Sequence, residues 1–308
     1  MRSTQFAFLL SAIFLNFHRN WCQLIAIVGN TNYDGQTYCP QGGGSQSPNN
    51  FGFNSALRYP AAAACGSQLF VSGGQLDWDD IDDIWLYDFE TRENSEFGKM
   101  ALRRSSHTMT CHDTRALFVA GGTNDGTRTS SLERCELATR TCSHVSDMPA
   151  AAFSHAAVIA NGVLYLLGGY PFPEGIALAY NIEQDSWRQL ARYKYHHYSY
   201  PGLAVLPSDP TKLLLCSGQA EDNDCERYDV TKDAWTDAAP MTHWRYKFAI
   251  LPINNELYAV AGQWGADPIK TRVVEKYNAT SDSWTLANKL LSIDNPFGFA
   301  AAVVDASC

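Results

Sequence analysis

The sequence predicts an all-β fold, a six-bladed β-propeller of four-stranded antiparallel blades. Three observations lead to this prediction. A short apolar segment ending in glycine recurs six times, an aromatic pair follows several of the copies, and the composition favours strands and turns. Aromatic residues make up 12% of the 308 residues, alongside 22 Gly and 13 Pro. That mixture is typical of many short strands joined by turns rather than of helix bundles.

The repeated apolar segment indicates a buried strand in each unit. The copies are LIAIVG (24–29), LFVSGG (69–74), LFVAGG (117–122), LYLLGG (164–169), LLLCSG (213–218) and LYAVAG (257–262). Their final glycines are spaced by 45, 48, 47, 49 and 44 residues. A period of this length marks a repeat architecture, and the terminal glycines suit a turn with positive φ or a close backbone approach.

A second element follows the apolar segment and predicts a hairpin. Tyr is followed by Asp or Asn at 87–88, 180–181, 228–229 and 277–278, and Trp stands seven residues after the Tyr at Trp187, Trp235 and Trp284. We expect Tyr to end one strand, Asp or Asn to begin the turn, and Trp to pack back from the next strand. Asn94 stands at the Trp position of the first regular repeat.

The Gly-Gly, Tyr-Asp and Trp landmarks at this period resemble the kelch repeat, over residues 22 to 308. The resemblance implies a propeller, in which four-stranded sheets stack radially to bury faces that one sheet alone would expose. Kelch propellers serve many unrelated tasks, so the resemblance specifies the fold more strongly than the function.

The two ends of the chain predict how the ring closes. Residues 1–20 contain Arg2 and the apolar run FAFLLSAIFLNF, which fits a secretory signal peptide; the alternative is an ordinary buried strand. Residues 21–308 would then form one six-bladed propeller. The strand 297–304 is expected to complete the blade begun at Leu24, which removes an exposed sheet edge.

Nine cysteines predict disulfides, in agreement with an oxidising compartment. The strand register pairs Cys22 with Cys308. Cys135 and Cys142 stand at the Tyr and Trp positions of one hairpin, and Cys216 and Cys225 flank the turn of another. Cys39, Cys65 and Cys111 remain, so at least one thiol is expected to be unpaired. The alternative for each cysteine is a small buried apolar residue.

One face of the ring is expected to bind a protein partner. The loops after each Gly pair and the loops that enter each innermost strand should share this face, and they are rich in Trp, Tyr and Arg, the residue types of binding hot spots. The predicted contact residues are Trp78, Arg104, Arg128, Tyr170, His197, Trp244, Arg245, Tyr246 and Trp264, with Asn32, Tyr33, Arg58, Tyr59, His155, Glu174 and Tyr198 in the same loops. Packing between blades is the alternative for about half of them.

The net charge of −9 disfavours nucleic acid, and no apolar run is long enough to span a membrane. Catalytic and nucleotide-binding motifs are absent, and neither the His196-His197 pair nor the acidic run 77–83 has the spacing of a metal site, so no metal or cofactor is expected. Asn278-Ala279-Thr280 is a glycosylation sequon in an expected outer turn.

The leading hypothesis is a secreted or extracellular, non-enzymatic protein-binding propeller. The first alternative, implied by the kelch resemblance, is a cytoplasmic substrate adaptor of a ubiquitin ligase, seen here without its BTB or F-box domain. The second is a sugar-acting enzyme resembling a sialic acid mutarotase, for which Arg104, Arg245 and Glu174 are the candidate residues.

Overall fold

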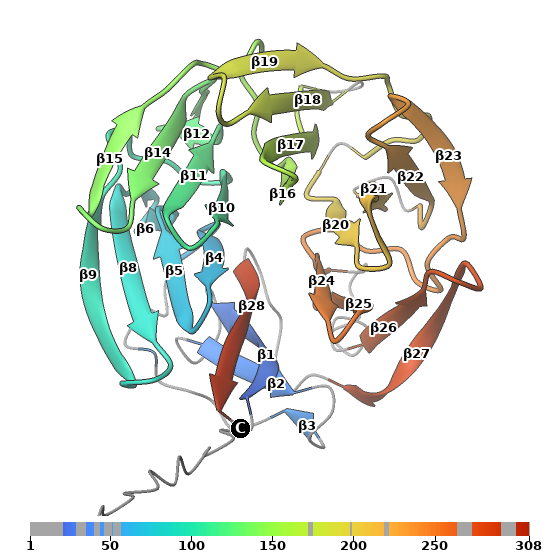
Figure 1. The fold of residues 1–308 in the computed structure, drawn as a ribbon. Helices are drawn as coiled ribbons and strands as arrows, with labels where there is room; N and C mark the ends of the chain where they lie inside the picture. Colours follow the sequence, from blue (N-terminus) through green and yellow to red (C-terminus); the bar gives the residue numbers. More distant parts are fainter. Residues whose placement is uncertain are drawn as a thin grey trace, which may run out of the picture.

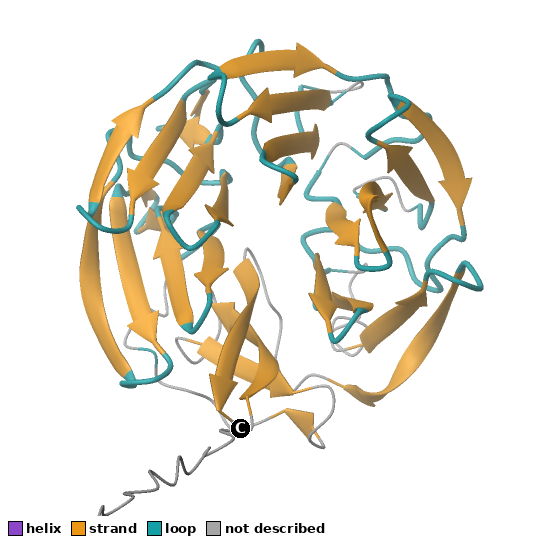
Figure 2. Cartoon of the chain, in the orientation of Figure 1, coloured by secondary structure: helices purple, strands orange, loops and turns teal. Residues whose placement is uncertain are grey.

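The computed structural model is built from β-strands arranged in a ring (Figure 1). It describes residues 21–28, 35–39, 44–45, 51, 57–171, 175–197, 199–218, 222–263, 273–290 and 300–307. Strands and loops alone make up this described part of the chain, as Figure 2 shows. The prediction of an all-β propeller with four-stranded antiparallel blades is therefore confirmed. The expected signal peptide, 1–20, lies outside the described residues.

Five blades are each made from one continuous stretch of chain, with the strands in order from the centre of the ring outward. Their strands are β4 (Ala61–Cys65), β5 (Gln68–Ser72), β8 (Asp83–Asp88) and β9 (Glu93–Lys99) in blade 1; β10 (Thr108–His112), β11 (Ala116–Ala120), β14 (Leu132–Glu136) and β15 (Thr141–His144) in blade 2; β16 (Ala156–Ala160), β17 (Val163–Gly168), β18 (Ile176–Asn181) and β19 (Ser186–Gln189) in blade 3; β20 (Gly202–Leu206), β21 (Asp209–Cys216), β22 (Cys225–Asp229) and β23 (Ala234–Ala238) in blade 4; and β24 (Ala249–Ile253), β25 (Glu256–Val260), β26 (Val273–Asn278) and β27 (Ser283–Leu290) in blade 5.

A further four-stranded sheet, the closing sheet, joins the two ends of the chain. Its order is β28 (Ala300–Ser307), β1 (Trp21–Val28), β2 (Gly35–Cys39) and β3 (Gly44–Ser45). Val303 pairs with Ile25 and Val304 with Leu24, so the predicted pairing of the C-terminal strand with the N-terminal strand is confirmed. The expectation of six blades is wrong, because only five blades of the described residues are formed from continuous chain. The first apolar copy, in β1, lies in this composite sheet, whose outer strand β3 has only two residues.

The hydrophobic core is divided among the contacts between neighbouring sheets. Blade 2 packs on blade 3 through Phe118, Leu132, Leu166 and Leu178, for example. The closing sheet packs on both of its neighbours, since alternate residues of β1 point in opposite directions. Ile25 and Ile27 join the core shared with blade 5, whereas Ala26 and Val28 join the core shared with blade 1.

The aromatic landmarks hold each hairpin of blades 3, 4 and 5 together as predicted. Tyr180 lies directly opposite Trp187 in the register, with ring centroids 4.9 Å apart. The Tyr180 hydroxyl donates to Asp185 at 2.7 Å, and the Trp187 indole donates to the Ser146 carbonyl at 2.9 Å. Tyr228 with Trp235 and Tyr277 with Trp284 repeat the arrangement. The landmarks therefore fasten the outer strand to the chain segment that arrives from the preceding blade.

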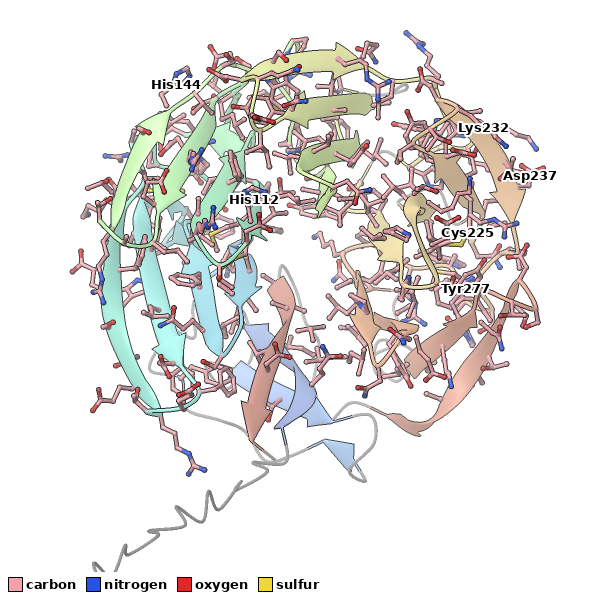
Figure 3. All side chains as sticks on the ribbon, viewed as in Figure 1. His112, His144, Cys225, Lys232, Asp237 and Tyr277 are labelled. Carbon is pink, nitrogen blue, oxygen red and sulfur yellow. A yellow bond between two sulfur atoms is a disulfide. The ribbon has the colours of Figure 1, made fainter. Side chains whose placement is uncertain are left out.

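Three disulfides are present among the described residues. Cys135–Cys142 and Cys216–Cys225 are those predicted, within blades 2 and 4. Figure 3 shows Cys225 inside the ring relative to Lys232 and Asp237, which lie at its outer rim.

The third disulfide, Cys65–Cys111, joins β4 to β10 and so connects two blades, which corrects the assignment of these two cysteines as left over. For the predicted Cys22–Cys308 pair, Cys308 lies outside the described residues, as does Cys39 with respect to its side chain.

Candidate protein-binding face

The two predicted loop sets share one face of the ring, here called the glycine face. In blades 1, 2, 3 and 5, an isolated β-bridge connects a residue just before the inner strand with a residue just after the Gly motif. The bridges join Arg58 to Gln75, Ser105 to Thr123, Phe153 to Tyr170 and Tyr246 to Gln263. This part of the prediction is confirmed, because each bridge places one member of each loop set side by side.

The Gly pairs are required because backbone passes directly over both residues. The first glycine lies against the segment that enters the next blade, and the second lies against the segment that enters its own blade. Gly121 and Gly122 have φ of 60° and 96°, a region that side-chain-bearing residues rarely adopt. A Cβ on Gly121 would lie 2.5 Å from the Ala152 carbonyl oxygen, and one on Gly122 would lie 2.6 Å from that of Ser105. The Gly122 amide donates to the Ala152 carbonyl at 2.8 Å. Glycine therefore sets how closely consecutive blades approach at this face.

Arg104 and Arg245, two of the predicted contact residues, are instead buried, with exposed fractions of 0% and 2%. Arg104 forms an ion pair with Glu133 and donates to the carbonyls of Gly121 and Ser131 at 2.9 and 3.1 Å. Burial lowers the pKa of Arg104, and the charge of Glu133 opposes that shift. Arg245 forms the same ion pair with Glu275 at 2.5 Å. Each arginine side chain therefore fastens the segment that enters its blade to the second and third strands of that same blade.

His197 occupies the corresponding place in blade 4 and is 1% exposed. Its Nδ1 lies 2.6 Å from the Ser217 carbonyl, and its Nε2 lies 3.3 Å from Glu226. The prediction that Arg104, His197 and Arg245 contact a partner is wrong, because their side chains are buried in contacts inside the blades. The sequence signal for a structural role was an Arg or His shortly before the inner strands of blades 2, 4 and 5, followed about thirty residues later by a Glu.

A ring of backbone hydrogen bonds surrounds the axis at the glycine face. These bonds link five residues, one from each blade, which we call the backbone ring. All five have φ between 46° and 57°, and they are Tyr59, Ser106, Ser154, Tyr200 and Lys247. The amide of each of the last four donates to the carbonyl of the one before, at 2.7 to 3.2 Å. Their side chains meet over the axis, where the Tyr59 and Tyr200 rings stack with centroids 6.3 Å apart. The Ser106 and Tyr200 hydroxyl oxygens lie 2.6 Å apart.

Trp78 is the most exposed large apolar side chain in the described chain, at 76%. It lies at the tip of the hairpin formed by β6 (Gln75–Leu76) and β7 (Asp79–Asp80). The guanidinium of exposed Arg58 stands 4.4 Å from its ring centroid, a cation–π geometry. Asp77 and Trp78 both have positive φ, of 50° and 75°, as the two central residues of a tight type I′ hairpin turn do.

The hairpin of blade 1 is tied to the corresponding hairpin of blade 2. That second hairpin consists of β12 (Thr123–Asn124) and β13 (Thr127–Arg128). The buried Asp80 carboxylate accepts a hydrogen bond from the Asp125 amide at 2.7 Å. Trp78, Arg58 and exposed Arg128 therefore belong to one connected ridge, which we call the Trp78 ridge.

The remaining predicted aromatics form rigid stacked pairs that are partly buried. Tyr170 stacks on Phe153 with centroids 4.8 Å apart and planes 7° apart. Trp244 and Tyr246 are parallel within 8° at 6.4 Å. His155 is buried beneath this layer and its Nε2 lies 3.1 Å from the Thr108 hydroxyl. Trp264, Asn32, Tyr33, Glu174 and Tyr198 lie outside the described residues.

The described part of the chain offers no group of three or more His, Cys, Asp or Glu side chains placed to hold a metal. It likewise holds no helix with the length and apolar character that a membrane crossing requires. Asn278 is exposed at the β26–β27 turn, where its side-chain oxygen accepts from the amides of Thr280 and Ser281.

Comparison with known proteins supports the kelch resemblance. The kelch motif model matches residues 56–95. Kelch-like protein 23 of Mus musculus is 24% identical over 236 residues, covering 74% of this chain and 41% of the relative. Kelch-like protein 25 of Xenopus tropicalis is 24% identical over 239 residues, covering 73% and 39%.

Kelch repeat and BTB domain-containing protein 12 of Homo sapiens is 25% identical over 178 residues, covering 54% of this chain and 23% of the relative. The chain thus spans about two fifths of the length of the first of these curated relatives. With the propeller of glycine-paired, four-stranded blades described above, these matches support a kelch-repeat family for this chain.

Proposed function

We propose that this chain is a non-enzymatic protein-binding module that contacts a protein partner through the Trp78 ridge on its glycine face. The observation that carries the proposal is Trp78 itself, with 76% of its surface exposed beside an exposed arginine. Tryptophan and arginine dominate binding hot spots because they bury large areas and retain polar groups for orientation. A soluble protein rarely leaves such a side chain uncovered without a use for it.

The rest of the face supports the same function. The backbone ring, the stacked aromatic pairs and the buried ion pairs fix the loops on a rigid scaffold, which lowers the entropic cost of binding. We propose further that the closing sheet completes the ring beside the five blades, so that the ring has no open edge.

We propose that the protein works outside the cytosol, in a secreted or extracellular setting. Three disulfides among the described residues support this, because such bonds persist in oxidising compartments. Exposed Asn278 would then be available for glycosylation. Expression in a secreting eukaryotic cell, followed by N-terminal sequencing and glycosidase treatment, tests both points. A cytosolic product that begins at Met1 and is not glycosylated would contradict them.

A cytoplasmic substrate adaptor is the second candidate function, favoured by the relative whose name contains a BTB domain. The mutarotase alternative is weaker, because Arg104 and Arg245, two of its three candidate residues, are buried in ion pairs.

The test of the binding proposal is quantitative capture with matched variants. Immobilised wild-type protein, Trp78→Ala/Arg128→Glu and Leu286→Ala are exposed to detergent-solubilised cell-surface protein, and captured proteins are quantified by mass spectrometry. Leu286 is the matched control, since it is also an exposed apolar residue, at 55%, but lies in the outer strand β27. We expect specific proteins to be retained by wild type and Leu286→Ala and lost by the double variant. The same captured set for all three would refute the proposal.

A further inference from the structure

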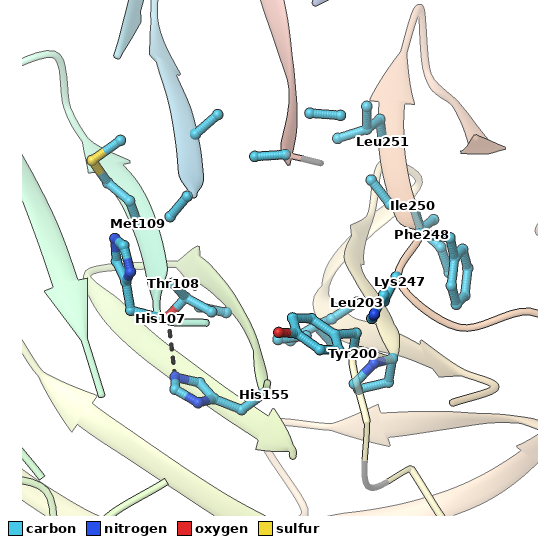
Figure 4. A pocket seen from close by; sticks show the side chains of 18 of the residues that line it. His107, Thr108, Met109, His155, Tyr200, Leu203, Lys247, Phe248, Ile250 and Leu251 are labelled. Atoms are coloured by element: carbon cyan, nitrogen blue, oxygen red, sulfur yellow. Dashed lines mark hydrogen bonds between the residues drawn. The ribbon is translucent and has the colours of Figure 1, made fainter. Parts of the chain in front are cut away.

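The central channel contains a cavity of about 190 Å³ beneath the glycine face. Residues from all six innermost strands line it, including Ala62, Thr108, Ala157, Leu203 and Ala301. Figure 4 shows His107, Thr108 and His155 on one side of this space and Tyr200 and Lys247 on the other. Drug-sized ligands occupy roughly 300–1,000 Å³, so a cavity of this size fits a smaller molecule.

The cavity is chemically divided into a polar end and an apolar wall. The polar end carries Lys247, Tyr200, Thr108 and two histidines, whereas the wall consists of alanines with Leu203, Phe248, Ile250 and Leu251. The alanines of the inner strands keep the wall open, because larger side chains at those places would fill the channel. Such a division suits a ligand with one charged group and one apolar chain.

Lys247 brings a positively charged group to the polar end. The Lys247 ammonium lies 4.9 Å from the Tyr59 ring centroid and 5.7 Å from that of Tyr200. Among the described lining residues there is no Asp or Glu. Burial lowers the pKa of Lys247 because it disfavours the charged form, and an anion beside the ammonium would favour that form.

The two histidines add hydrogen-bonding capacity without adding a competing charge. His107 and His155 are 5% and 4% exposed, and burial lowers the pKa of each, His155 to about 4, so both are neutral at pH 7. Nε2 of His107 lies 2.8 Å from the Ser72 hydroxyl. Within the described chain, Nδ1 of each histidine has no hydrogen-bond partner.

We propose that the channel binds a small organic anion, a carboxylate with a short apolar chain. The carboxylate lies beside Lys247 and Tyr200, and the chain extends along the alanines of β4, β16 and β28. This site is separate from the Trp78 ridge, and its occupancy does not depend on the proposed protein-binding function.

Isothermal titration of the folded full chain with sodium octanoate tests the proposal. We expect saturable one-to-one binding. Octanol, which has the same chain without the charge, and acetate, which has the charge without the chain, should each bind at least tenfold more weakly. An octanoate affinity no higher than that of acetate would overturn the proposal, because the apolar wall would then contribute nothing.

Two variants and one control locate the site. Lys247→Met removes the charge with little change in side-chain volume, and Ala157→Leu fills the wall; each should weaken octanoate binding at least tenfold. Lys194→Met removes an exposed lysine that pairs with Asp237, outside the cavity, and should leave binding unchanged. Thermal melting confirms that each variant is folded. Equal affinity of folded Lys247→Met and wild type would contradict the proposed position of the carboxylate, and so would equal losses in all three variants.

Discussion

Blades 2 and 3 fill the same buried position with opposite chemistry. In blade 2, Glu133 pairs with Arg104 and also accepts hydrogen bonds from the amides of Ala101 and Leu102 at 2.7 and 3.1 Å. In blade 3, Leu178 takes the place of Glu133. Glu133 pairs with Val119, two residues before Gly121, and Leu178 pairs with Leu166, two residues before Gly168. Ala152 takes the place of Arg104, because both carbonyls accept a hydrogen bond from the second glycine of the preceding blade. Gly74 donates to Arg104, and Gly122 donates to Ala152.

Blade 3 also removes one of the donors that would need an acceptor. Met100 and Met148 are equivalent, as their amides donate to the corresponding carbonyls of Asp82 and Ser130. Pro149 therefore stands at the place of Ala101, and proline has no amide hydrogen to satisfy. The difference teaches that this buried position accepts either a complete polar network or an apolar contact. It also teaches that three positions change together, namely 101, 104 and 133 in blade 2 and 149, 152 and 178 in blade 3.

The outer hairpins of the two blades differ in a parallel way. Cys135 lies opposite Cys142 in blade 2 at the place where Tyr180 lies opposite Trp187 in blade 3. The first pair is joined by a disulfide, and the second by ring contact and hydrogen bonds. The fold requires a cross-strand fastening at this register rather than one residue type.

The largest expected effect comes from breaking the polar network of blade 2 on one side only. Glu133→Leu leaves the Arg104 guanidinium buried without its counter-charge and the Ala101 amide without its acceptor. We expect a loss of about 3–5 kcal/mol in the free energy of unfolding, measured by urea denaturation.

Converting blade 2 fully to the blade 3 arrangement should recover much of that loss. The variant is Ala101→Pro/Arg104→Ala/Glu133→Leu, which removes the charge and one donor together. Replacement of buried ion pairs by apolar residues is often close to neutral. A triple variant less stable than Glu133→Leu alone would contradict the equivalence of the two blades.

Acid should weaken a feature that the two blades share. His107 and His155 occupy equivalent places after the ring residues Ser106 and Ser154, where blade 5 has Phe248. Burial lowers the pKa of His155 to about 4, whereas an unfolded histidine titrates near 6.5. Between these pH values the unfolded chain binds a proton that the folded chain does not, so stability falls as the pH falls. For His155 we expect about 3 kcal/mol over that window.

His155→Phe is the matched variant, because it copies blade 5 and removes the titrating group. Denaturation series at pH 7 and pH 4.5 should show a smaller pH-dependent loss for this variant than for wild type. Identical losses would show that His155 is not protonated preferentially in the unfolded chain.

Removing the disulfide of blade 2 should have an intermediate effect. Cys135 and Cys142 are seven residues apart in sequence, so their bond closes a short loop. In the chain-entropy model, Cys135→Ala/Cys142→Ala should cost about 2 kcal/mol. Thermal and urea unfolding measure the difference, and a variant as stable as wild type would mean that the bond contributes nothing at this register.

The smallest expected effect is in the blade 3 hairpin. Tyr180→Phe keeps the contact with Trp187 but removes the hydroxyl that donates to Asp185. A single hydrogen bond contributes about 1 kcal/mol. Tyr228→Phe in blade 4 removes the equivalent bond to Asp233 and should cost a similar amount, so a several-fold difference between the two would argue against equivalent roles.

The repeating features of the fold could be predicted from sequence because each has a local cause. The Gly pairs, the Tyr–Trp register and the pairing of residue 303 with Ile25 all follow from strand periodicity and turn chemistry. The Cys65–Cys111 bond could not be predicted in this way, because it joins two blades and depends on how closely their inner strands approach.

The candidate site was predicted less well for a related reason. Arginine before an inner strand is compatible with both an exposed contact and a buried ion pair, and the choice depends on a Glu about thirty residues later, as in Arg104 with Glu133. Trp78 was placed correctly in an exposed loop, because no residue of the repeat pattern is expected to pack against it.

The most direct test of the central claim, that the glycine face binds through its accessible residues while its buried residues build the blades, is hydroxyl-radical footprinting with and without a captured partner. The account predicts that the partner protects Trp78 from oxidation and leaves Leu286 and Trp187 unchanged. Protection of Leu286 with Trp78 still fully reactive would contradict it.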